Sequence, residues 1–473
     1  MHDDSTEPLP RALLSRLAEA VGDGGVLLTA AADRWAYGYD NSRRHGQPGA
    51  VALPANHAAV CDVVRACHEA GVPLVPRGHG TGTAGASVPL PGAVVLGLER
   101  LGRIVRVDPA NRLLVAEPGV TNQAIQQAAA AHGFFWAPDP TSAAVCTLGG
   151  NLACNAAGPR AVKYGTTRDN VLGLQAVTGT GAPLRTGVLT TKGVVGYDLT
   201  RLLIGSEGTL AVITEATLKL TPLPEAKATL RAVYADMDAA ARAVTRIMAQ
   251  PVTPCALEFI DAAAIEMVRR YSKAELPTDA GALLMIEVDG SRACLDAMVA
   301  AVADAANGDG CLDVRSARDA AEVVRLWETR KALSPALRNV APKKINEDVA
   351  VPVSRMPELI NGLAALSAHY GVTIVNFGHA GNGNIHVNLL VDPDDALQME
   401  RAEPCLSDVF DLVLHLGGTL SGEHGIGTEK RDFVSRELDT VALQLMHAIK
   451  TQFDPTGILN PGKKLPPLAG EKD

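Results

Sequence analysis

Two histidines and one acidic residue are the side chains in this sequence best suited to bind a metal ion. His379 and His386 lie in GHAGNGNIHVN, and Glu423 lies in SGEHGIG. The glycines and asparagines between the histidines predict a tight turn between two strands, which would bring the two imidazoles together. Imidazole nitrogens and a carboxylate oxygen suit a borderline divalent ion such as zinc or manganese. We therefore predict a metal site at these three residues.

His424 follows the acidic residue directly, but its side chain should project in another direction and stay available as a base. Imidazole suits this role because its ordinary pKa lies near neutrality. Hydrogen-bonded histidines that cap strands are the structural alternative. The occurrence of His-x6-His in one glycine-rich turn and of Glu-His in another favours a chemical role.

Arg330 is the cationic residue best suited to hold a carboxylate. A guanidinium group binds a carboxylate through two parallel hydrogen bonds. Arg330 lies on a predicted helix with Lys331, Ser334 follows one turn later, and Lys343 and Lys344 precede a predicted strand. Such charges usually form a solvated face, and we interpret Lys331 in this way. Arg330 is instead predicted to contact an anionic substrate.

Three glycine-rich segments in the first half could line a large, flat ligand. In the first, from Arg77 to Gly85, backbone N–H groups and two threonine hydroxyls could surround a pyrophosphate. This segment is not a P-loop, because it lacks Gly-Lys-Ser/Thr, and no long helix follows it. The others lie between Pro138 and Gly165 and from Ile204 to Leu210. Any one of them could be a structural turn, but three in one predicted domain favour a ligand site.

The elements that must position these residues differ between the two halves of the chain. In the first half, short strands predominate, and apolar residues at helical spacing predict a helix over Ala58–Ala70 that ends at Gly71. The other helices expected there are Pro10–Val21 and Asn122–His132, and the strands are Val51–Pro54, Val72–Pro76, Val94–Leu98, Ile104–Val107, Leu113–Ala116, Val171–Thr178 and Leu210–Leu220.

Thr221–Pro224 reads as a linker, and beyond it strands alternate with longer helices. This alternation predicts an α+β layer with the sheet on one side and the helices on the other. The expected strands are Thr229–Tyr234, Leu283–Val288, Val349–Pro352, Thr373–Gly378 and Ile385–Val391, and the helices are Asp238–Met248, Ser291–Ala306, Ser354–Tyr370, Ala396–Leu416 and Thr440–Gln452.

Composition limits the class of protein. With 473 residues the chain is long enough for two or more domains. A net charge of -9 argues against a nucleic-acid partner, because neutralising phosphates requires a basic face. The acidic N-terminus does not resemble a secretory signal, and we find no uncharged apolar run of about 18 residues. We expect a cytoplasmic protein without a membrane span.

The eight cysteines do not form a Cys-x-x-Cys pair. An iron–sulfur cluster or a zinc ribbon within this chain is therefore disfavoured. Without a secretory context, the cysteines are expected to be reduced and mostly buried.

Together these segments resemble the FAD-linked oxidase family with the vanillyl-alcohol-oxidase type of flavin domain. The similarity is greatest to the branch containing D-lactate dehydrogenases, D-2-hydroxyglutarate dehydrogenases and the flavin subunit of glycolate oxidase. It covers the chain from about Val51 to Lys463, and it rests on PRGHGTGTAG, IGSEGTLAVIT, NFGHAGNGNIHVN, SGEHGIG and DPTGILNPGK.

The resemblance implies an α+β protein. Residues 1–222 would form a two-subdomain FAD-binding domain and residues 223–422 an α+β substrate-binding cap with a sheet covered by helices. Residues 423–473 would complete the FAD and active site. FAD would be bound non-covalently, and His79 is a departure because close relatives often have a smaller residue there.

The resemblance also assigns residues to roles. His379, His386 and Glu423 match the metal ligands, and His424 matches the catalytic base. Substrate contacts are expected at Arg330, Ser334, Lys344 and Asn388. FAD contacts are expected at Pro76, Arg77, Gly78, His79, Gly80, Thr81, Gly82, Pro140, Thr141, Thr147, Gly150, Asn151, Asn155, Gly158, Gly208, Val212, Ile213 and Asn460.

The expected reaction is oxidation of a D-2-hydroxy acid by hydride transfer to the flavin N5. A divalent ion would orient the substrate, and His424 would remove the hydroxyl proton. The stretch KINEDVAVP favours D-lactate, with D-2-hydroxyglutarate and glycolate as alternatives. The electrons would leave to a cytochrome, a quinone or an electron-transfer flavoprotein rather than to NAD, and this acceptor could hold the protein at a membrane surface. A homodimer is left open.

Two interpretations from other classes are also left open. A metal-dependent hydrolase could use the same two histidines, acidic residue and base to activate water. A non-catalytic subunit of an electron-transfer complex could keep the fold alone. The glycine-rich segments argue against the first alternative, and the intact His424 argues against the second.

Overall fold

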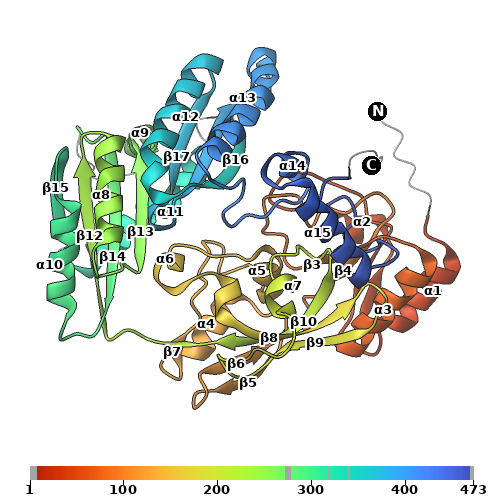
Figure 1. Cartoon of the computed structure of the whole chain (residues 1–473). Coiled ribbons are helices and arrows are strands. Elements are labelled where there is room, and N and C mark those ends of the chain that lie inside the picture. Colours follow the sequence, from red (N-terminus) through yellow and green to blue (C-terminus); the bar gives the residue numbers. More distant parts are fainter. Residues whose placement is uncertain (1–7, 272–278, 318, 338–340, 469–473) are drawn as a thin grey trace. The chain divides into compact units, whose positions relative to one another are not determined.

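A computed structural model of the protein describes residues 8–271, 279–317, 319–337 and 341–468 (Figure 1). The chain divides into two compact units. The first consists of Met1–Ala157, Gly165–Leu223 and Glu423–Asp473, and the second of Gly158–Tyr164 and Pro224–Gly422. Each unit is thus assembled from segments that are distant in sequence.

The first unit contains a four-stranded sheet in the order β1-β2-β4-β3. Strands β2 and β3 both run parallel to β4, and helix α3 connects β2 to β3. Asn56 caps the start of α3 by accepting a hydrogen bond from the backbone N–H of Ala59, and Gly71 ends it in the left-handed conformation. The elements are α1 (Arg11–Ala20), β1 (Val26–Leu28), α2 (Ala31–Trp35), β2 (Ala50–Leu53), α3 (His57–Ala70), β3 (Leu74–Arg77) and β4 (Val94–Gly97).

A five-stranded antiparallel sheet, ordered β5-β6-β10-β8-β9, forms the other half of the first unit. Its core has Trp136 and Ile125 fully buried among leucine, valine and alanine side chains. The elements are β5 (Ile104–Asp108), β6 (Leu113–Ala116), α4 (Asn122–Ala130), β7 (Phe134–Phe135), α5 (Leu148–Cys154), β8 (Val171–Thr178), β9 (Pro183–Gly187), α7 (Leu199–Leu203), β10 (Ala211–Lys219), β11 (Thr221–Pro222), α14 (Val434–Glu437) and α15 (Thr440–Phe453).

The second unit is built on a seven-stranded antiparallel sheet in the order β15-β12-β14-β13-β17-β18-β16. The elements are α6 (Ala161–Tyr164), β12 (Ala226–Tyr234), α8 (Met237–Ala249), β13 (Ala256–Asp261), α9 (Ala262–Tyr271), β14 (Ala282–Gly290), α10 (Leu295–Ala306), β15 (Cys311–Ser316), α11 (Ala320–Leu337), β16 (Lys343–Ala350), α12 (Met356–Tyr370), β17 (Thr373–His379), β18 (Asn384–Val391) and α13 (Ala396–His415).

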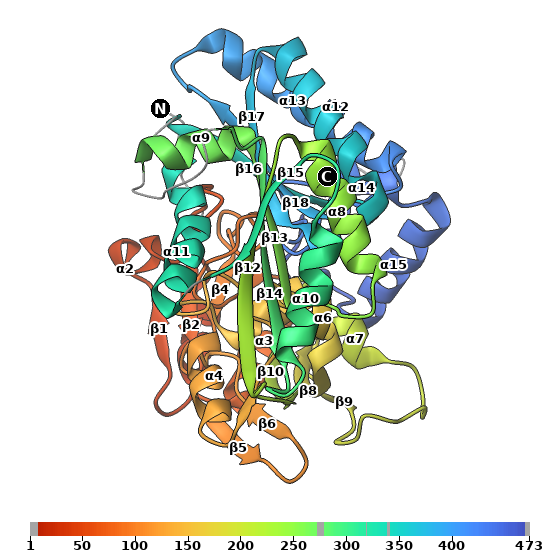
Figure 2. The ribbon, with the colours of Figure 1, turned by 90° about the vertical axis from the view of Figure 1, so that its left-hand side faces the viewer.

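Helices cover both faces of this sheet. Helices α8 and α10 lie on one side of the strands and α9 and α11 on the other, as Figure 2 shows. On the α9 and α11 side, Ile265, Leu333 and Leu337 pack with Met285 and Val375 of the sheet. The expectation of helices on one side only was therefore wrong. The periodicity of a helix shows that it has an apolar face but not which face of a sheet it will cover.

Several elements begin or end elsewhere than the sequence predicts. Strand β16 covers Lys343–Ala350 and stops before Pro352, because proline cannot donate to the strand ladder. Thr221–Pro222, expected in a linker, forms a short strand paired with Phe134–Phe135. Helix α5 lies within the glycine-rich stretch expected to be a loop.

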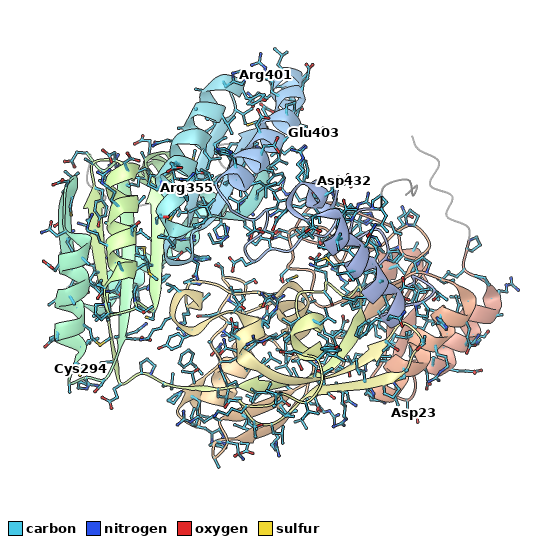
Figure 3. The ribbon with its side chains drawn as sticks, viewed as in Figure 1. Asp23, Cys294, Arg355, Arg401, Glu403 and Asp432 are labelled. Atoms are coloured by element: carbon cyan, nitrogen blue, oxygen red, sulfur yellow. The ribbon has the colours of Figure 1, made fainter. Side chains whose placement is uncertain are left out.

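All eight cysteines lie among the described residues, and none of them forms a disulfide. Five are buried, as expected for structural thiols. Cys294 is exposed just before α10 (Figure 3), while Arg401 and Glu403 lie exposed on α13. Within the described ranges, we find no helix with the length and apolar character needed to span a membrane.

Candidate active site

Most of the predicted metal-binding and substrate-binding residues of the second unit lie on one face of its sheet. Side chains alternate between the two faces of a strand, so His386 and Asn388 share one face of β18. Cross-strand pairing places Phe377 opposite His386 and Asp348 on its other side. This face is the one covered by α9 and α11, because Val375 and Phe377 belong to one hydrophobic cluster with side chains of both helices. Arg330 belongs to α11.

The two predicted metal-binding histidines are brought together by the strand pair β17–β18. Gly383, with a φ of 66°, closes the turn between them, where a side chain would strike the Val351 carbonyl. The two imidazole rings lie 5.2 Å apart, centroid to centroid, in an edge-to-face arrangement. Both histidines are buried.

Glu423 directly follows Gly422, the last residue of the second unit. Each of His379, His386 and Glu423 offers one ligand atom, and these atoms all lie within 4.8 Å of one another. Two imidazoles and a carboxylate at this spacing can converge on a single zinc or manganese ion.

A fourth residue, Glu258 on β13, completes the surroundings of His379. The two residues are cross-strand neighbours, and the Nδ1 atom of His379 lies 2.5 Å from Oε1 of Glu258. Glu258 is fully buried. Burial opposes its ionisation, but the charges of His379 and Arg330 outweigh this effect and lower the pKa of Glu258. It is therefore a carboxylate at neutral pH.

Arg330 is held by the same carboxylate. Its Nε atom donates to Oε2 of Glu258 at 2.8 Å, and its guanidinium lies 4.8 Å from the centroid of the Phe377 ring. Its side chain is only 11% exposed, so Arg330 does not belong to the solvated face that such helix charges usually form. The Nε bond leaves the two terminal nitrogens to bind a further anion.

Sequence reasoning missed Glu258 and Phe377. The available signal was the stretch CALEFID, in which Glu258 interrupts an apolar run before Asp261 ends it. Lys and Glu are almost never fully buried unless paired, so a Glu at this position predicts a buried partner. Identifying that partner as His379 required knowing that β13 pairs with β17.

The remaining predicted substrate contacts are placed differently. The amide of Asn388 donates to the backbone carbonyls of Val375 and His386, both at 3.0 Å, while its buried Oδ1 has no hydrogen-bond partner among the described residues. Lys344 lies on β16 opposite Leu390, on the same face. Ser334 falls within α11, but its side chain lies outside the described residues.

In the first unit the three glycine-rich segments meet one another. A Cβ atom on Gly78 would lie 2.4 Å from Oγ1 of Thr147, which caps α5 by accepting a hydrogen bond from Gly150. A Cβ atom on Gly208 would lie 3.1 Å from the Pro76 ring. The first segment therefore touches the second at Gly78, and the third touches Pro76, the residue that precedes the first segment.

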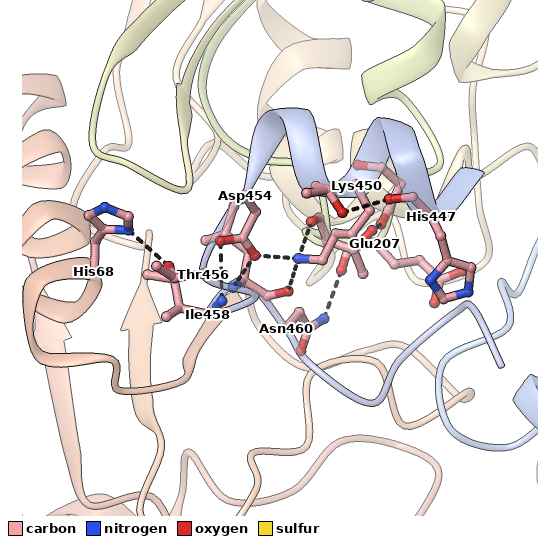
Figure 4. A network of polar contacts seen from close by, with 12 residues as sticks. His68, Glu207, His447, Lys450, Asp454, Thr456, Ile458 and Asn460 are labelled. Carbon is pink, nitrogen blue, oxygen red and sulfur yellow. Dashed lines mark hydrogen bonds and ion pairs between the residues drawn. The ribbon is translucent and has the colours of Figure 1, made fainter. Parts of the chain in front are cut away.

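The C-terminal segment, which carries Asn460, lies against the edge of β3. Its backbone continues the edge of β3 through hydrogen bonds between Leu74 and residues 458 and 460. The Asn460 amide donates to the carbonyls of Ala86 and Glu207, and its buried Oδ1 has no hydrogen-bond partner among the described residues. Asp454 accepts from the backbone N–H groups of residues 458 and 459 and pairs with Lys450 (Figure 4).

The other predicted FAD contacts lie on these segments. His79 is exposed, and its Nδ1 donates to the Val145 carbonyl at 2.7 Å. Gly158 groups with the second unit rather than with the first. The buried residues among them are Arg77, Asn151, Gly208, Val212 and Ile213. The partly buried ones are Pro76, Gly78, Gly80, Thr81, Gly82, Pro140, Gly150 and Asn155.

These segments fit FAD. Backbone that tolerates no Cβ at Gly78, together with a left-handed turn at Gly80, lets main-chain N–H groups approach a pyrophosphate closely. The unpartnered Oδ1 of Asn460 supplies a buried acceptor beside them.

Solved structures of other proteins have the same fold as this chain. The chain superimposes on p-cresol methylhydroxylase with a TM-score of 0.81, covering 98% of both chains at 18% sequence identity. An alkyldihydroxyacetonephosphate synthase gives a TM-score of 0.74 at 20% identity, covering 96% of this chain and 86% of that one. The protein therefore has the two-domain FAD-binding fold of the vanillyl-alcohol-oxidase type.

The sequence matches two family models, the FAD binding domain over residues 48–187 and the C-terminal domain of FAD linked oxidases over residues 223–464. The chain belongs to the FAD-linked oxidases. It is 38% identical to the glycolate oxidase subunit GlcD of Bacillus subtilis, covering 91% of this chain and 92% of that protein. It is 36% identical to a D-lactate dehydrogenase of Archaeoglobus fulgidus, covering 87% of this chain and 90% of that one. It is thus an FAD-linked oxidoreductase of this type, and the hydrolase interpretation is dropped.

Proposed function

We propose that this protein oxidises a small D-2-hydroxy acid, with D-lactate as substrate and pyruvate as product. The observation that carries the proposal is the bridge formed by Glu258, which holds a predicted metal-binding histidine on one oxygen and the guanidinium of Arg330 on the other. In a 2-hydroxy acid the hydroxyl and the carboxylate are on adjacent carbons. A site that places a metal ligand next to a carboxylate-binding group matches that substrate.

Each residue has a separate task in this proposal. The terminal nitrogens of Arg330 bind the substrate carboxylate. Asn388 contacts the substrate through its buried Oδ1, which can accept a hydrogen bond. His379, His386 and Glu423 would hold a divalent ion, which would polarise the hydroxyl as a Lewis acid. His424 removes the hydroxyl proton. Lys344 and Ser334 are proposed as further contacts to the carboxylate. FAD, when bound, supplies the two-electron oxidant.

Glycolate is the second candidate substrate. Relatives named as glycolate oxidase subunits and relatives named as D-lactate dehydrogenases match the chain over similar lengths. Glycolate lacks the methyl group of lactate, so a single pocket wall decides between them. D-2-Hydroxyglutarate remains a third alternative, and it would need another cation for its second carboxylate.

We also propose that the electrons leave to a separate acceptor, which would be a cytochrome, a quinone or an electron-transfer flavoprotein. The protein would be cytoplasmic, with any contact to a membrane made through that acceptor.

Rapid-mixing measurements of flavin bleaching test the proposed function. The protein would be mixed anaerobically with D-lactate, L-lactate, glycolate and D-2-hydroxyglutarate. We expect D-lactate to reduce the flavin fastest and L-lactate to have little effect. Faster reduction by glycolate would favour the second candidate. Failure of all four acids to bleach the flavin would refute the proposal and restore the interpretation as a non-catalytic subunit.

A further inference from the structure

Glu258 bonds both a predicted metal-binding histidine, His379, and the predicted carboxylate-binding group of Arg330. We propose that it is a positioning residue for both. It would select the tautomer of His379 that can bind a metal ion, and it would fix Arg330 at a set distance from that ion. This inference deepens the proposed function and rests on it.

The first step concerns the proton on His379. Glu258 accepts at Oε2 from the guanidinium of Arg330, which is always protonated, and a carboxylate paired in this way also accepts at Oε1, so the 2.5 Å contact places the hydrogen on Nδ1 of His379. Nε2 then carries the lone pair, which is the form in which an imidazole nitrogen binds a metal ion. Such carboxylate–histidine pairs around metal sites fix the tautomer and the ring orientation, and they make the imidazole a better ligand.

The second step concerns Arg330. Its Nε–H donates to the other oxygen of Glu258 at 2.8 Å, and the guanidinium lies over the Phe377 ring. The guanidinium is therefore held in place from two directions. Because one nitrogen is already bonded to Glu258, the substrate carboxylate has to be bound by the two terminal nitrogens. Glu258 thus determines which edge of the guanidinium faces the substrate.

Glutamine in place of Glu258 would break this arrangement without changing its size. An amide has one oxygen acceptor and one NH2 donor, whereas both partners of Glu258 are donors. The guanidinium cannot give up its proton, so the amide oxygen would turn to Arg330 and the NH2 group to His379. His379 would then have to accept at Nδ1 and carry its hydrogen on Nε2. That tautomer cannot bind a metal ion through Nε2.

Aspartate in place of Glu258 would have the opposite effects, because it keeps the chemistry of the carboxylate and changes its size. It keeps two acceptors and the charge, so the Nδ1–H tautomer of His379 survives. It is one methylene shorter and disturbs the packing of a fully buried site more than glutamine does. A positioning role therefore predicts that Glu258→Gln weakens metal binding more than Glu258→Asp does. A merely structural role predicts the reverse order.

Glu287 offers a matched control. It is also a buried glutamate, on β14 of the same sheet, where it pairs with Lys227 at 3.2 Å and accepts a hydrogen bond from Thr229. Glu287→Gln removes a buried charge from the unit as Glu258→Gln does. Neither of these two partners is one of the predicted metal-binding residues.

The experiment measures zinc affinity by competition with a zinc-binding dye, using the FAD-loaded full chain. We expect Glu258→Gln to weaken zinc binding by about 10- to 100-fold. We expect Glu258→Asp to weaken it less, Glu287→Gln to leave it within about twofold, and all three variants to retain FAD. The KM for the hydroxy acid should rise in both Glu258 variants, because glutamine replaces the carboxylate that pairs with Arg330 by a neutral amide and aspartate holds Arg330 from a side chain one methylene shorter.

Zinc affinity in Glu258→Gln within about twofold of wild type would overturn the inference, as would a greater loss in Glu258→Asp than in Glu258→Gln. His386→Ala distinguishes failure of the positioning role of Glu258 from failure of the proposed metal site. If His386→Ala abolishes zinc binding while Glu258→Gln keeps it, only the positioning role fails. If the wild-type protein does not bind zinc or manganese, the proposed role of the metal fails as well.

Discussion

Asp348 is the direct cross-strand neighbour of His386 in the β16–β18 pair, and it is fully buried. Glu258 has the same relationship to His379 in the β13–β17 pair. Each of the two predicted metal-binding histidines thus has an acidic residue as its neighbour on the same face of the sheet. Directly opposed side chains on antiparallel strands have Cβ atoms about 5 Å apart, close enough to interact.

Asp348→Asn should weaken zinc binding, because it removes a negative charge next to His386. Asp348 also accepts a hydrogen bond from Ser421 at 3.1 Å, which ties the segment leading to Glu423 to the sheet. We expect an affinity loss of about tenfold or more, measured by dye competition. Ser421→Ala is the control, since it removes that hydrogen bond and keeps the charge. Equal losses in the two variants would assign the effect to the segment rather than to His386.

Arg330→Lys should raise the KM for D-lactate. Lysine keeps the positive charge, but it cannot bond Glu258 and still present a two-nitrogen edge to a carboxylate. A hydrogen bond to a charged group contributes about 1.5 to 3 kcal/mol, which corresponds to a loss of about 10- to 100-fold in kcat/KM. Steady-state kinetics with an artificial electron acceptor measure this loss. An unchanged kcat/KM would show that Arg330 does not bind the substrate.

Gly78→Ala should weaken FAD binding, because its Cβ would lie 2.4 Å from Oγ1 of Thr147. The double variant Gly78→Ala/Thr147→Ala tests this cause, since removing Oγ1 leaves the Thr147 Cβ at an ordinary distance of 3.6 Å. Thr147→Ala alone should cost about 1 kcal/mol through loss of the α5 cap. FAD content and the apparent Kd for FAD should partly recover in the double variant. Additive losses would mean that the clash is not the reason.

The sequence could predict these features to very different extents. Local motifs were enough for the turn between His379 and His386, because its glycines and asparagines permit only a tight connection. They were also enough for the end of α3 at Gly71. Such features are set by residues next to one another in the chain.

Features that depend on strand order were beyond the sequence. Glu258 and His379 are separated by 121 positions, and they meet only because β13 pairs with β17 in that register. A register shift by one residue would turn Glu258 to the other face of the sheet. The placement of α9 and α11 on the second face has the same origin, since it depends on the path of the chain between strands.

Asp261→Asn should change how stability depends on pH. Burial raises the pKa of Asp261 to about 6, above its ordinary value of 3.8, although it accepts hydrogen bonds from Ala264 and Asn376. A raised pKa in the folded state means that Asp261 contributes stability that is fully present below about pH 4 and is lost as the pH rises through about 6. The contribution is about 3 kcal/mol, at about 1.4 kcal/mol for each pKa unit.

Unfolding midpoints of wild type and Asp261→Asn between pH 4 and pH 7.5 measure this effect. The wild-type protein should lose stability relative to the variant as the pH rises, because asparagine does not titrate. Parallel pH profiles for the two proteins would show that Asp261 is ionised throughout the range.

His424→Ala and Glu423→Ala should fail in different ways, although the two residues are adjacent. Loss of a positioned base typically costs about 10²- to 10⁴-fold in rate, so His424→Ala should bind both FAD and zinc normally and reduce the flavin slowly. Glu423→Ala should lose zinc affinity, because it removes one of three predicted ligands. A collapse of the whole segment would instead harm zinc binding in both variants. Zinc titration together with flavin reduction by D-lactate separates these cases. If His424→Ala reduces flavin at nearly the wild-type rate, or if it loses zinc as Glu423→Ala should, then His424 is not the base.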